Sequence, residues 1–493
     1  MKRSIWSWLS IVVVLSLALS ACAAPAAPQP PAAQAPAAEA PAAAPAAAAT
    51  TAPAAAPTNT PLPTPTGAPI PEGAVKIDFW HSMGGDIGGK AIPKLATDFN
   101  VSQQKCYVTP TYQGSYDDSL NKLKAGLQSK DIPAVVQLFD IGTRLMVDLK
   151  VATPVQDFID AENYDVSDLE TNVLAYYTVD GRQWSMPFNT SNPMLYYNKD
   201  MFKAAGLDPE KPPRTWPEFE EVAAKLTQKD ASGKVTIPGA TFAIYGWFFE
   251  QLLAVSGGYY ADNENGRAAP ATEAAFNSPE GVAVMEWWKR MYDAGTMGNL
   301  GRKTVDVRNA FMAGQTAMII ESTATLRGMM DTAVGKFELG TAFLPRPNEE
   351  AFEKAGTIIG GASVWILNGR PEEEQQCAWE FVKFVSAPPQ QAYWHTMSGY
   401  YPIRKAAYDE PLDVEWRAKY PAFQTAIDQL HIAPNNRFTQ GGLIGVFPTA
   451  RQTIEGAIEE ILAGKATPQE ALDKAAASVT AAIEEYNITM GIQ

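Results

Sequence analysis

Strand and helix patterns alternate at the start of the folded part of this 493-residue chain. Apolar and polar residues alternate over residues 75–80, as in a strand with one buried face, and a helical pattern follows over 87–99. The strand pattern returns at 108–112 and 134–139, with another helical pattern between them. This β-α-β-α order predicts an α/β fold with a largely parallel sheet and helices on both of its faces.

The N-terminus is typical of an exported lipoprotein. Lys2 and Arg3 precede an apolar stretch at 11–19, which is the layout of a secretory signal. The sequence Leu19-Ser20-Ala21-Cys22 then predicts a lipoprotein processing site, with residues 1–22 as the signal segment and Cys22 as the lipidated residue. A plain secretory signal with a chance cysteine is the alternative. We expect an extracytoplasmic protein, in the periplasm or at the cell surface, that is lipid-anchored to the outer face of the cytoplasmic membrane.

Residues 23–73 predict a disordered tether. They are almost wholly Ala, Pro, Thr and Gln and contain no aromatic residue, so they cannot bury enough apolar surface to offset the entropy of folding. Proline-rich segments extend by roughly 3 Å per residue, which gives a maximal reach on the order of 150 Å. Such a tether lets the folded part work away from the membrane surface.

The folded part, residues 74–493, is long enough for two domains and carries the whole formal charge of −15. This negative charge argues against nucleic acid as a partner, because phosphate backbones are bound by clustered Lys and Arg. A small phosphorylated ligand is not excluded, since one arginine and a few backbone donors can hold a single phosphate. We expect Cys106 and Cys377 to be buried thiols, with a disulfide between them as the alternative.

The motifs of common catalytic sites are missing from the sequence. The histidines are His81, His395 and His431, and none has a second histidine or cysteine at metal-site spacing. There is no Gly-x-Ser-x-Gly elbow, P-loop, dinucleotide fingerprint or calcium loop. A carboxylate pair for glycoside hydrolysis remains an alternative, because the two partners need not be close along the chain. We expect a binding protein rather than an enzyme, with no cofactor and no metal.

A set of short sequence blocks resembles one family of transport receptors. The blocks run in order through residues 76–490 and comprise Phe79-Trp80-His81-Ser82-Met83, Pro187-Phe188-Asn189, Tyr196-Tyr197-Asn198-Lys199-Asp200, Gly206-Leu207-Asp208-Pro209-Glu210, Gly301-Arg302-Lys303, Ile358-Ile359-Gly360-Gly361-Ala362-Ser363-Val364-Trp365, Trp394-His395 and Gly399-Tyr400-Tyr401-Pro402-Ile403. Together they resemble the extracellular solute-binding proteins (family 1) of ABC importers, closest to the periplasmic glycerol-3-phosphate-binding proteins.

The resemblance implies a two-lobed periplasmic-binding-protein fold of the class II type. Several hinge crossings join the lobes in that fold, and the matching positions fall near Asn189, Gly360-Gly361 and Pro402. Lobe 1 would comprise residues 74–188 and 363–402, and lobe 2 would comprise 189–362 and 403–493. In that family the ligand binds in the cleft and the lobes close over it by a hinge motion.

The resemblance also implies a set of ligand-binding residues. Arg451 would donate to phosphate oxygens with help from Ser191, Ser322 and the Gly361 amide, and Asp140 and Tyr116 would bind the glycerol hydroxyls. The full set is Tyr116, Asp140, Ser191, Trp247, Ser322, Gly361, Tyr400 and Arg451.

Purely structural roles are the alternatives for six of these residues. Arg451 precedes a helical pattern rich in glutamate, so a surface ion pair is its alternative, and a helix cap is the alternative for Asp140. Ser191 and Ser322 would be ordinary loop residues without the resemblance, and Tyr116 and Tyr400 would be core residues.

Two departures from the family affect the expected ligand. The family has glutamate where this chain has Asp140, so we expect a longer or water-bridged contact to a hydroxyl. The family often has tryptophan three residues before Trp247, where this chain has Ile244. The loss of that ring would leave room for a larger group, such as a choline covered by cleft aromatics. We therefore expect Ile244 to shape the pocket, together with Trp80 and His81.

The resemblance thus predicts a monomeric substrate-binding lipoprotein that delivers sn-glycerol 3-phosphate or a glycerophosphodiester, such as glycerophosphocholine, to an ABC permease. A sugar or oligosaccharide receptor of an ABC importer is the nearest alternative, because such proteins share the lobes and features such as Tyr197-Asn198-Lys199-Asp200. An extracellular hydrolase is the alternative from another functional class.

Overall fold

The computed structural model describes residues 68–492. The expected signal segment, Cys22 and residues 23–67 of the expected tether lie outside the described residues. Within 68–492 no helix is both long enough and apolar enough to cross a membrane.

The first sheet contains the strands predicted from the alternating pattern. Its order is β2-β1-β3-β15-β4, with β7 paired to β15. Strand β1 runs parallel to β2 and β3, as predicted, whereas β15 runs antiparallel to β3, β4 and β7. The expectation of a largely parallel sheet therefore holds only for β1–β3. The strands are β1 (Val75–His81), β2 (Cys106–Tyr112), β3 (Val135–Phe139), β4 (Ala152–Thr153), β7 (Met186–Ser191) and β15 (Gly360–Leu367).

A second sheet has the order β12-β11-β13-β8-β14. Strand β11 is parallel to β12 and β13, and β8 is antiparallel to β13 and β14. Only Asn192 separates β7 of the first sheet from β8 of the second, so the chain passes directly between the sheets at this point. The strands are β8 (Pro193–Asn198), β11 (Ala240–Thr241), β12 (Met297–Gly298), β13 (Met318–Ser322) and β14 (Leu339–Ala342).

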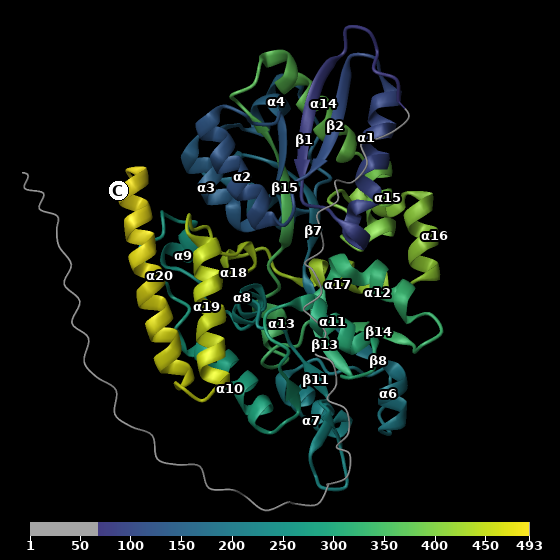
Figure 1. Cartoon of the computed structure of the whole chain (residues 1–493), viewed down its shortest axis with the longest axis vertical. Helices are drawn as coiled ribbons and strands as arrows, with labels where there is room; N and C mark the ends of the chain where they lie inside the picture. The colour runs from purple at the N-terminus through teal and green to yellow at the C-terminus, as the bar shows by residue number, and fades with distance from the viewer. Residues whose placement is uncertain (1–67, 493) are drawn as a thin grey trace, which may run out of the picture. The chain divides into compact units, whose positions relative to one another are not determined.

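Helices connect and cover these strands (Figure 1). Helices α1 and α14 pack against the β1–β2 pair, and the C-terminal helices α19 and α20 lie side by side, with α19 also packed on α8. The longer helices are α1 (Ala91–Ser102), α2 (Tyr116–Ser129), α7 (Trp216–Leu226), α8 (Gly246–Val255), α10 (Pro279–Asp293), α11 (Thr304–Met312), α14 (Glu372–Val385), α15 (Pro388–Ser398), α16 (Pro411–Lys419), α17 (Ala422–Ile432), α19 (Phe447–Leu462) and α20 (Pro468–Met490).

Short elements complete the fold. Two small hairpins pair β5 (Thr178–Val179) with β6 (Arg182–Gln183) and β9 (Gln228–Lys229) with β10 (Val235–Ile237). The shorter helices are α3 (Thr143–Leu149), α4 (Val155–Glu162), α5 (Thr171–Tyr177), α6 (Lys199–Ala204), α9 (Asp262–Gly266), α12 (Leu326–Ala333), α13 (Ala351–Lys354) and α18 (Arg437–Gln440). The mixed sheets and their helices confirm the predicted α/β class.

Cys106 and Cys377 form a disulfide, so the expectation of two buried thiols is wrong. The bond joins β2 to α14 across 271 residues of sequence, with the Cα atoms 5.6 Å apart. Residues so distant in sequence meet only because α14 packs against β1 and β2, which periodicity alone does not reveal. The disulfide fixes a helix from late in the chain to the edge strand of the first sheet.

Reduction of this disulfide should lower the free energy of unfolding by about 3 kcal/mol, because the cross-link restricts the unfolded chain. Denaturant unfolding with and without dithiothreitol measures the difference. The double variant Cys106→Ala/Cys377→Ala is the control, and its transition should not respond to the reductant. Equal midpoints for the oxidised and reduced wild type would contradict a stabilising role.

Candidate functional site

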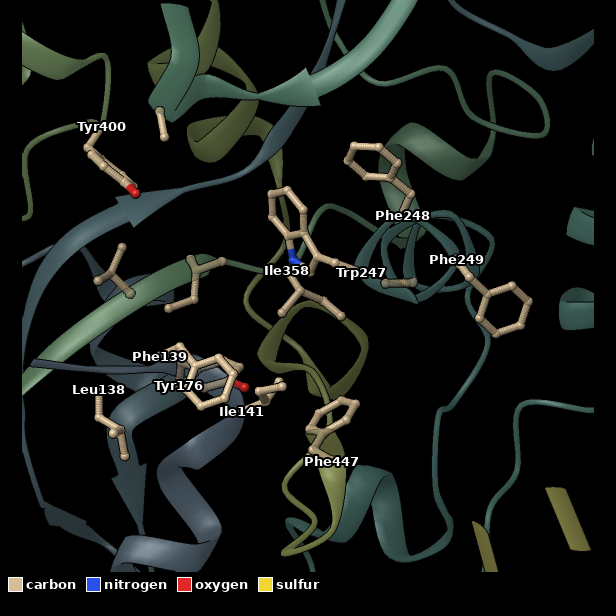
Figure 2. Close-up of a cluster of buried hydrophobic side chains, with 14 of the residues drawn as sticks. Leu138, Phe139, Ile141, Tyr176, Trp247, Phe248, Phe249, Ile358, Tyr400 and Phe447 are labelled. Carbon is tan, nitrogen blue, oxygen red and sulfur yellow. The ribbon is translucent and has the colours of Figure 1, made fainter. Parts of the chain in front are cut away.

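One cavity of about 650 Å³ brings together all eight predicted ligand-binding residues. They reach it from both sheets: Ser191 ends β7, Gly361 lies near the start of β15, and Ser322 ends β13. Figure 2 shows Phe139, Trp247 and Tyr400, three aromatic residues that line the cavity, together with Ile358 and Phe447 of the surrounding core. The predicted set is Tyr116, Asp140, Ser191, Trp247, Ser322, Gly361, Tyr400 and Arg451.

Arg451 is a buried residue at the inner face of α19, where only 7% of its surface is exposed. Its Nε and Nη2 donate to Glu250 Oε2 at 3.0 and 2.6 Å, and Nη2 also donates to Asp140 Oδ2 at 3.1 Å. The alternative of a surface ion pair is therefore wrong. Glu455 and Glu459, the glutamates that suggested it, pair with Arg302 instead.

The local fold explains why Arg451 is inside. It shares the buried stripe of α19 with Phe447, Ala450 and Ile454, at helical spacing. Helix α8 approaches closely because its first residue is Gly246, where an added Cβ would lie only 2.7 Å from the Arg451 carbonyl oxygen. The close approach of α8 and α19 holds Glu250 against the guanidinium.

Burial governs the electrostatics of this cluster. Burial raises the pKa of Glu250 to about 7, although Arg451 opposes the shift. Burial also raises the pKa of Asp140, again against the opposing effect of Arg451. For Arg451 itself, burial favours the neutral form, but the two carboxylates outweigh it and raise the pKa above the ordinary arginine value. Arg451 therefore stays charged while it is shared between two carboxyl groups.

Tyr116 is positioned by a chain of hydrogen bonds in the first sheet. Gln137 Nε2 donates to Asn189 Oδ1 at 2.6 Å, and Asn189 Nδ2 donates to the Tyr116 hydroxyl at 2.8 Å. Ser115 caps α2 by accepting from the Asp118 amide, which places Tyr116 at the first helical position. Burial raises the pKa of Tyr116 well above its usual value, so its hydroxyl remains a neutral donor.

Two adjacent glycines let the backbone of β15 come close to the cavity. Gly361 has φ +95°, and an added Cβ would lie 1.9 Å from the Asn189 carbonyl oxygen. A Cβ at Gly360 would lie 2.6 Å from the Trp247 ring. Only glycine fits at these positions without displacing the strand or the tryptophan.

The structure also adds residues that sequence reasoning missed. Arg308 lines the cavity and donates to Glu321 at 2.9 Å, and Tyr245 lines it next to Trp247. Glu250 lies behind Arg451 as its closest carboxylate partner. Its one sequence signal is that it is the only charged residue in the apolar run of α8.

The three residues expected to shape the pocket do not line the cavity. Ile244 is only 2% exposed. Its neighbour Tyr245 supplies an aromatic ring to the cavity wall, which offsets the absence of the tryptophan that the family often has at position 244. His81 is packed in the core, where burial lowers its pKa to about 4. Trp80 is half-buried on β1 and packs against the core.

Known proteins resemble this chain over most of its length. The family model described as bacterial extracellular solute-binding protein matches residues 94–425. The chain is 35% identical over 404 residues to the sn-glycerol-3-phosphate-binding periplasmic protein UgpB of Escherichia coli K12, which covers 81% of this chain and 90% of that protein. A UgpB of Shigella flexneri serotype 5b shows the same identity and coverage.

Solved structures of similar proteins share the fold. UgpB from Mycobacterium tuberculosis in complex with glycerophosphocholine matches with a TM-score of 0.71 and 25% identity, over 84% of this chain and 100% of that one. The cyclic alpha-maltosyl-1,6-maltose binding protein from Arthrobacter globiformis matches with a TM-score of 0.68 and 24% identity, over the same shares. These matches confirm the predicted periplasmic-binding-protein fold.

Glu250 should make stability depend on pH. Its pKa is raised from 4.5 to about 7 in the folded state, so the folded protein holds this proton more tightly than the unfolded chain does. The contribution of Glu250 to stability is fully present below its pKa in the unfolded chain. This contribution is lost as the pH rises through its pKa in the folded protein. Relative to Glu250→Gln, the wild type should lose about 3 kcal/mol of unfolding free energy between pH 4 and pH 8.

Denaturant unfolding at several pH values measures this difference. Glu460→Gln is the matched control, since Glu460 lies on α19 but pairs with the exposed Lys474, and its pH profile should follow the wild type. Parallel profiles for the wild type and Glu250→Gln would contradict the raised pKa.

Proposed function

Because the chain belongs to the bacterial extracellular solute-binding proteins of ABC importers, we propose that it captures sn-glycerol 3-phosphate or a glycerophosphodiester such as glycerophosphocholine. The ligand would occupy the cavity that contains Arg451 and would then pass to the membrane-spanning permease. No bond is made or broken in this function. The relatives are named as binding proteins, which supports a receptor rather than the hydrolase alternative.

The observation that carries the proposal is the guanidinium of Arg451 at the cavity wall. Its Nε and Nη2 serve Glu250 and Asp140, while Nη1 has no hydrogen bond to residues 68–492 and is able to donate to a phosphate oxygen. The Gly361 amide and the hydroxyls of Ser191 and Ser322 add further donors around the same cavity. One fixed cation together with several neutral hydrogen-bond donors is well suited to binding a phosphate group.

The size and lining of the cavity support a ligand larger than glycerol phosphate. A volume of about 650 Å³ lies within the range of pockets that hold drug-sized molecules. Trp247, Tyr245 and Tyr400 provide aromatic surface in this cavity. Such rings bind a quaternary ammonium group by cation–π attraction, which suits the choline of a glycerophosphocholine.

Closure of two lobes over the ligand is part of the proposal. The direct passage from β7 to β8 at Asn192 and the start of β15 at Gly360 support hinge crossings near Asn189 and Gly360-Gly361. Residues 74–188 with 363–402 would form one lobe, and the remainder the other. Asp140 and Arg451 come from opposite lobes in this division, so their ion pair would form on closure.

A monomeric state and a lipid anchor are also part of the proposal. The protein would be a monomer, held on the outer face of the cytoplasmic membrane by a lipid on Cys22 and a tether at residues 23–73.

A sugar receptor is the second candidate. The carboxylates of Asp117 and Asp140 and the ring of Trp247 line the cavity, and carboxylates with aromatic faces also suit neutral polyols. The Arthrobacter globiformis structure with the same fold is named for a maltose-based ligand. Charge discriminates the two candidates, because a neutral sugar does not require Arg451.

Isothermal titration calorimetry against glycerol 3-phosphate, glycerophosphocholine and maltose tests this function. One of the two phosphates should bind, and Arg451→Ala should weaken it by at least about 30-fold, since a charged hydrogen-bond donor is lost from a buried site. The matched control is Arg290→Ala, which removes an exposed arginine paired with Glu220. Binding of maltose alone would overturn the phosphate assignment and leave a sugar receptor.

A further inference from the structure

Glu250 is a buried carboxyl group with a single polar partner. It is 1% exposed and lies in α8, a helix whose residues are all buried. Its Oε2 accepts two hydrogen bonds from Arg451, at 3.0 and 2.6 Å. Its Oε1 is also buried and has no hydrogen-bond partner among the described residues. A buried carboxylate oxygen without a donor is unfavourable, and protonation of that oxygen relieves the cost.

Few charges face Glu250 from the surrounding elements. Helix α19 contributes Arg451, and the 3₁₀ turn after β3 contributes Asp140. Arg267, from the segment that follows α9, is more remote and donates to the carbonyls of Tyr176, Gln440 and Gly441. Helix α10 packs on α8 with buried side chains that carry no charge. Glu455 of α19 accepts from the Gly246 amide at the start of α8, and Arg437 of α18, which also packs on α8, is paired with Glu264.

The phenols near Glu250 do not compete for a proton near neutral pH. Burial raises the pKa of Tyr176 and Tyr260 well above the usual tyrosine value, and the pKa of Tyr245 to about 12. These three side chains therefore stay neutral when a ligand binds. The charge of the cluster is set by Asp140, Glu250 and Arg451.

Arg302, Lys303 and Arg308 also line the cavity, but the buried cluster itself is short of positive charge for an anion held at Arg451. Two carboxylates share one guanidinium, which gives a formal charge of −1 when both are ionised. A phosphodiester at Arg451 would bring the sum to −2 in a buried site, where like charges repel strongly. If one carboxyl group takes up a proton as the phosphodiester enters, the formal charge stays at −1.

We propose that Glu250 is the residue that adjusts the charge of this subsite: ionised, it holds Arg451 in place in the empty cavity, and it takes up one proton when the phosphate binds. The proton leaves the buffer and bonds to Oε1, while Oε2 continues to accept from Arg451. This proposal rests on the proposed phosphate-binding function and makes Glu250 a positioning residue that acts through Arg451.

Geometry favours Glu250 over Asp140 as the proton acceptor. Asp140 lines the cavity, where a ligand hydroxyl can donate to it, and the adjacent backbone amide of Ile141 stabilises its charged form. Glu250 lies behind Arg451, out of reach of such donors, and burial already brings its pKa to about 7. A further negative charge at Arg451 raises that pKa again, so proton uptake occurs near neutral pH.

Calorimetry of glycerophosphocholine binding in two buffers of different ionisation enthalpy measures the protons taken up. This ligand is the right probe because its phosphodiester and choline do not titrate near neutral pH, unlike a phosphomonoester. At pH 7.5 the wild type should take up about half a proton per ligand bound. Its affinity should also fall as pH rises further, by at most about tenfold per pH unit.

Two variants test whether Glu250 is the residue that takes up the proton. Glu250→Gln should lose the proton uptake and show an affinity that is flat between pH 7 and pH 9. Glu460→Gln, on the outer part of α19, should behave as the wild type. The wild-type measurement needs no variant, so it decides whether a proton is taken up even if Glu250→Gln does not fold.

The possible outcomes separate the two proposals. Binding of glycerophosphocholine with the same heat in both buffers would overturn proton uptake and leave the proposed function intact. Uptake that persists in Glu250→Gln would overturn the assignment to Glu250. Failure of the wild type to bind any glycerophosphate would overturn the proposed function and this inference together.

Discussion

The buried ion cluster of Asp140, Glu250 and Arg451 is the constraint on which the site depends. A guanidinium at 7% exposure is stable only beside carboxylates, and these come from the end of β3 and from α8, 311 and 201 residues away in sequence. The cluster therefore joins the first sheet to the helices of the C-terminal part. It also holds the guanidinium of Arg451 in one position at the cavity wall, where it is a charged donor.

The rest of the site is arranged around this cluster by rigid elements. Gly360 and Gly361 let the backbone of β15 approach the cavity. The hydrogen bonds from Gln137 to Asn189 and from Asn189 to Tyr116 fix the position of the Tyr116 hydroxyl. These contacts hold donors in place before the ligand arrives, so less conformational entropy is lost on binding. The disulfide between β2 and α14 anchors the sheet that contains Gln137, Asn189, Gly360 and Gly361.

Local patterns were enough to predict the class of the fold but not its long-range contacts. The alternation at residues 75–80 predicted β1, and the strand pattern at 134–139 predicted β3. The residues of the cavity came from the family resemblance, since neither Ser191 nor Ser322 has a local signal of its own. Glu250 was missed, and the Cys106–Cys377 bond was predicted only as an alternative, because their partners are distant in sequence. Only the packing of α8 on α19 and of α14 on β2 reveals them.

The most direct test of phosphate recognition at Arg451 is a crystal structure of the protein with glycerophosphocholine. We predict a phosphate oxygen within about 3 Å of an Arg451 nitrogen, with the choline against the aromatic wall of the cavity. A ligand bound away from Arg451, with the guanidinium still held only by Asp140 and Glu250, would contradict this role.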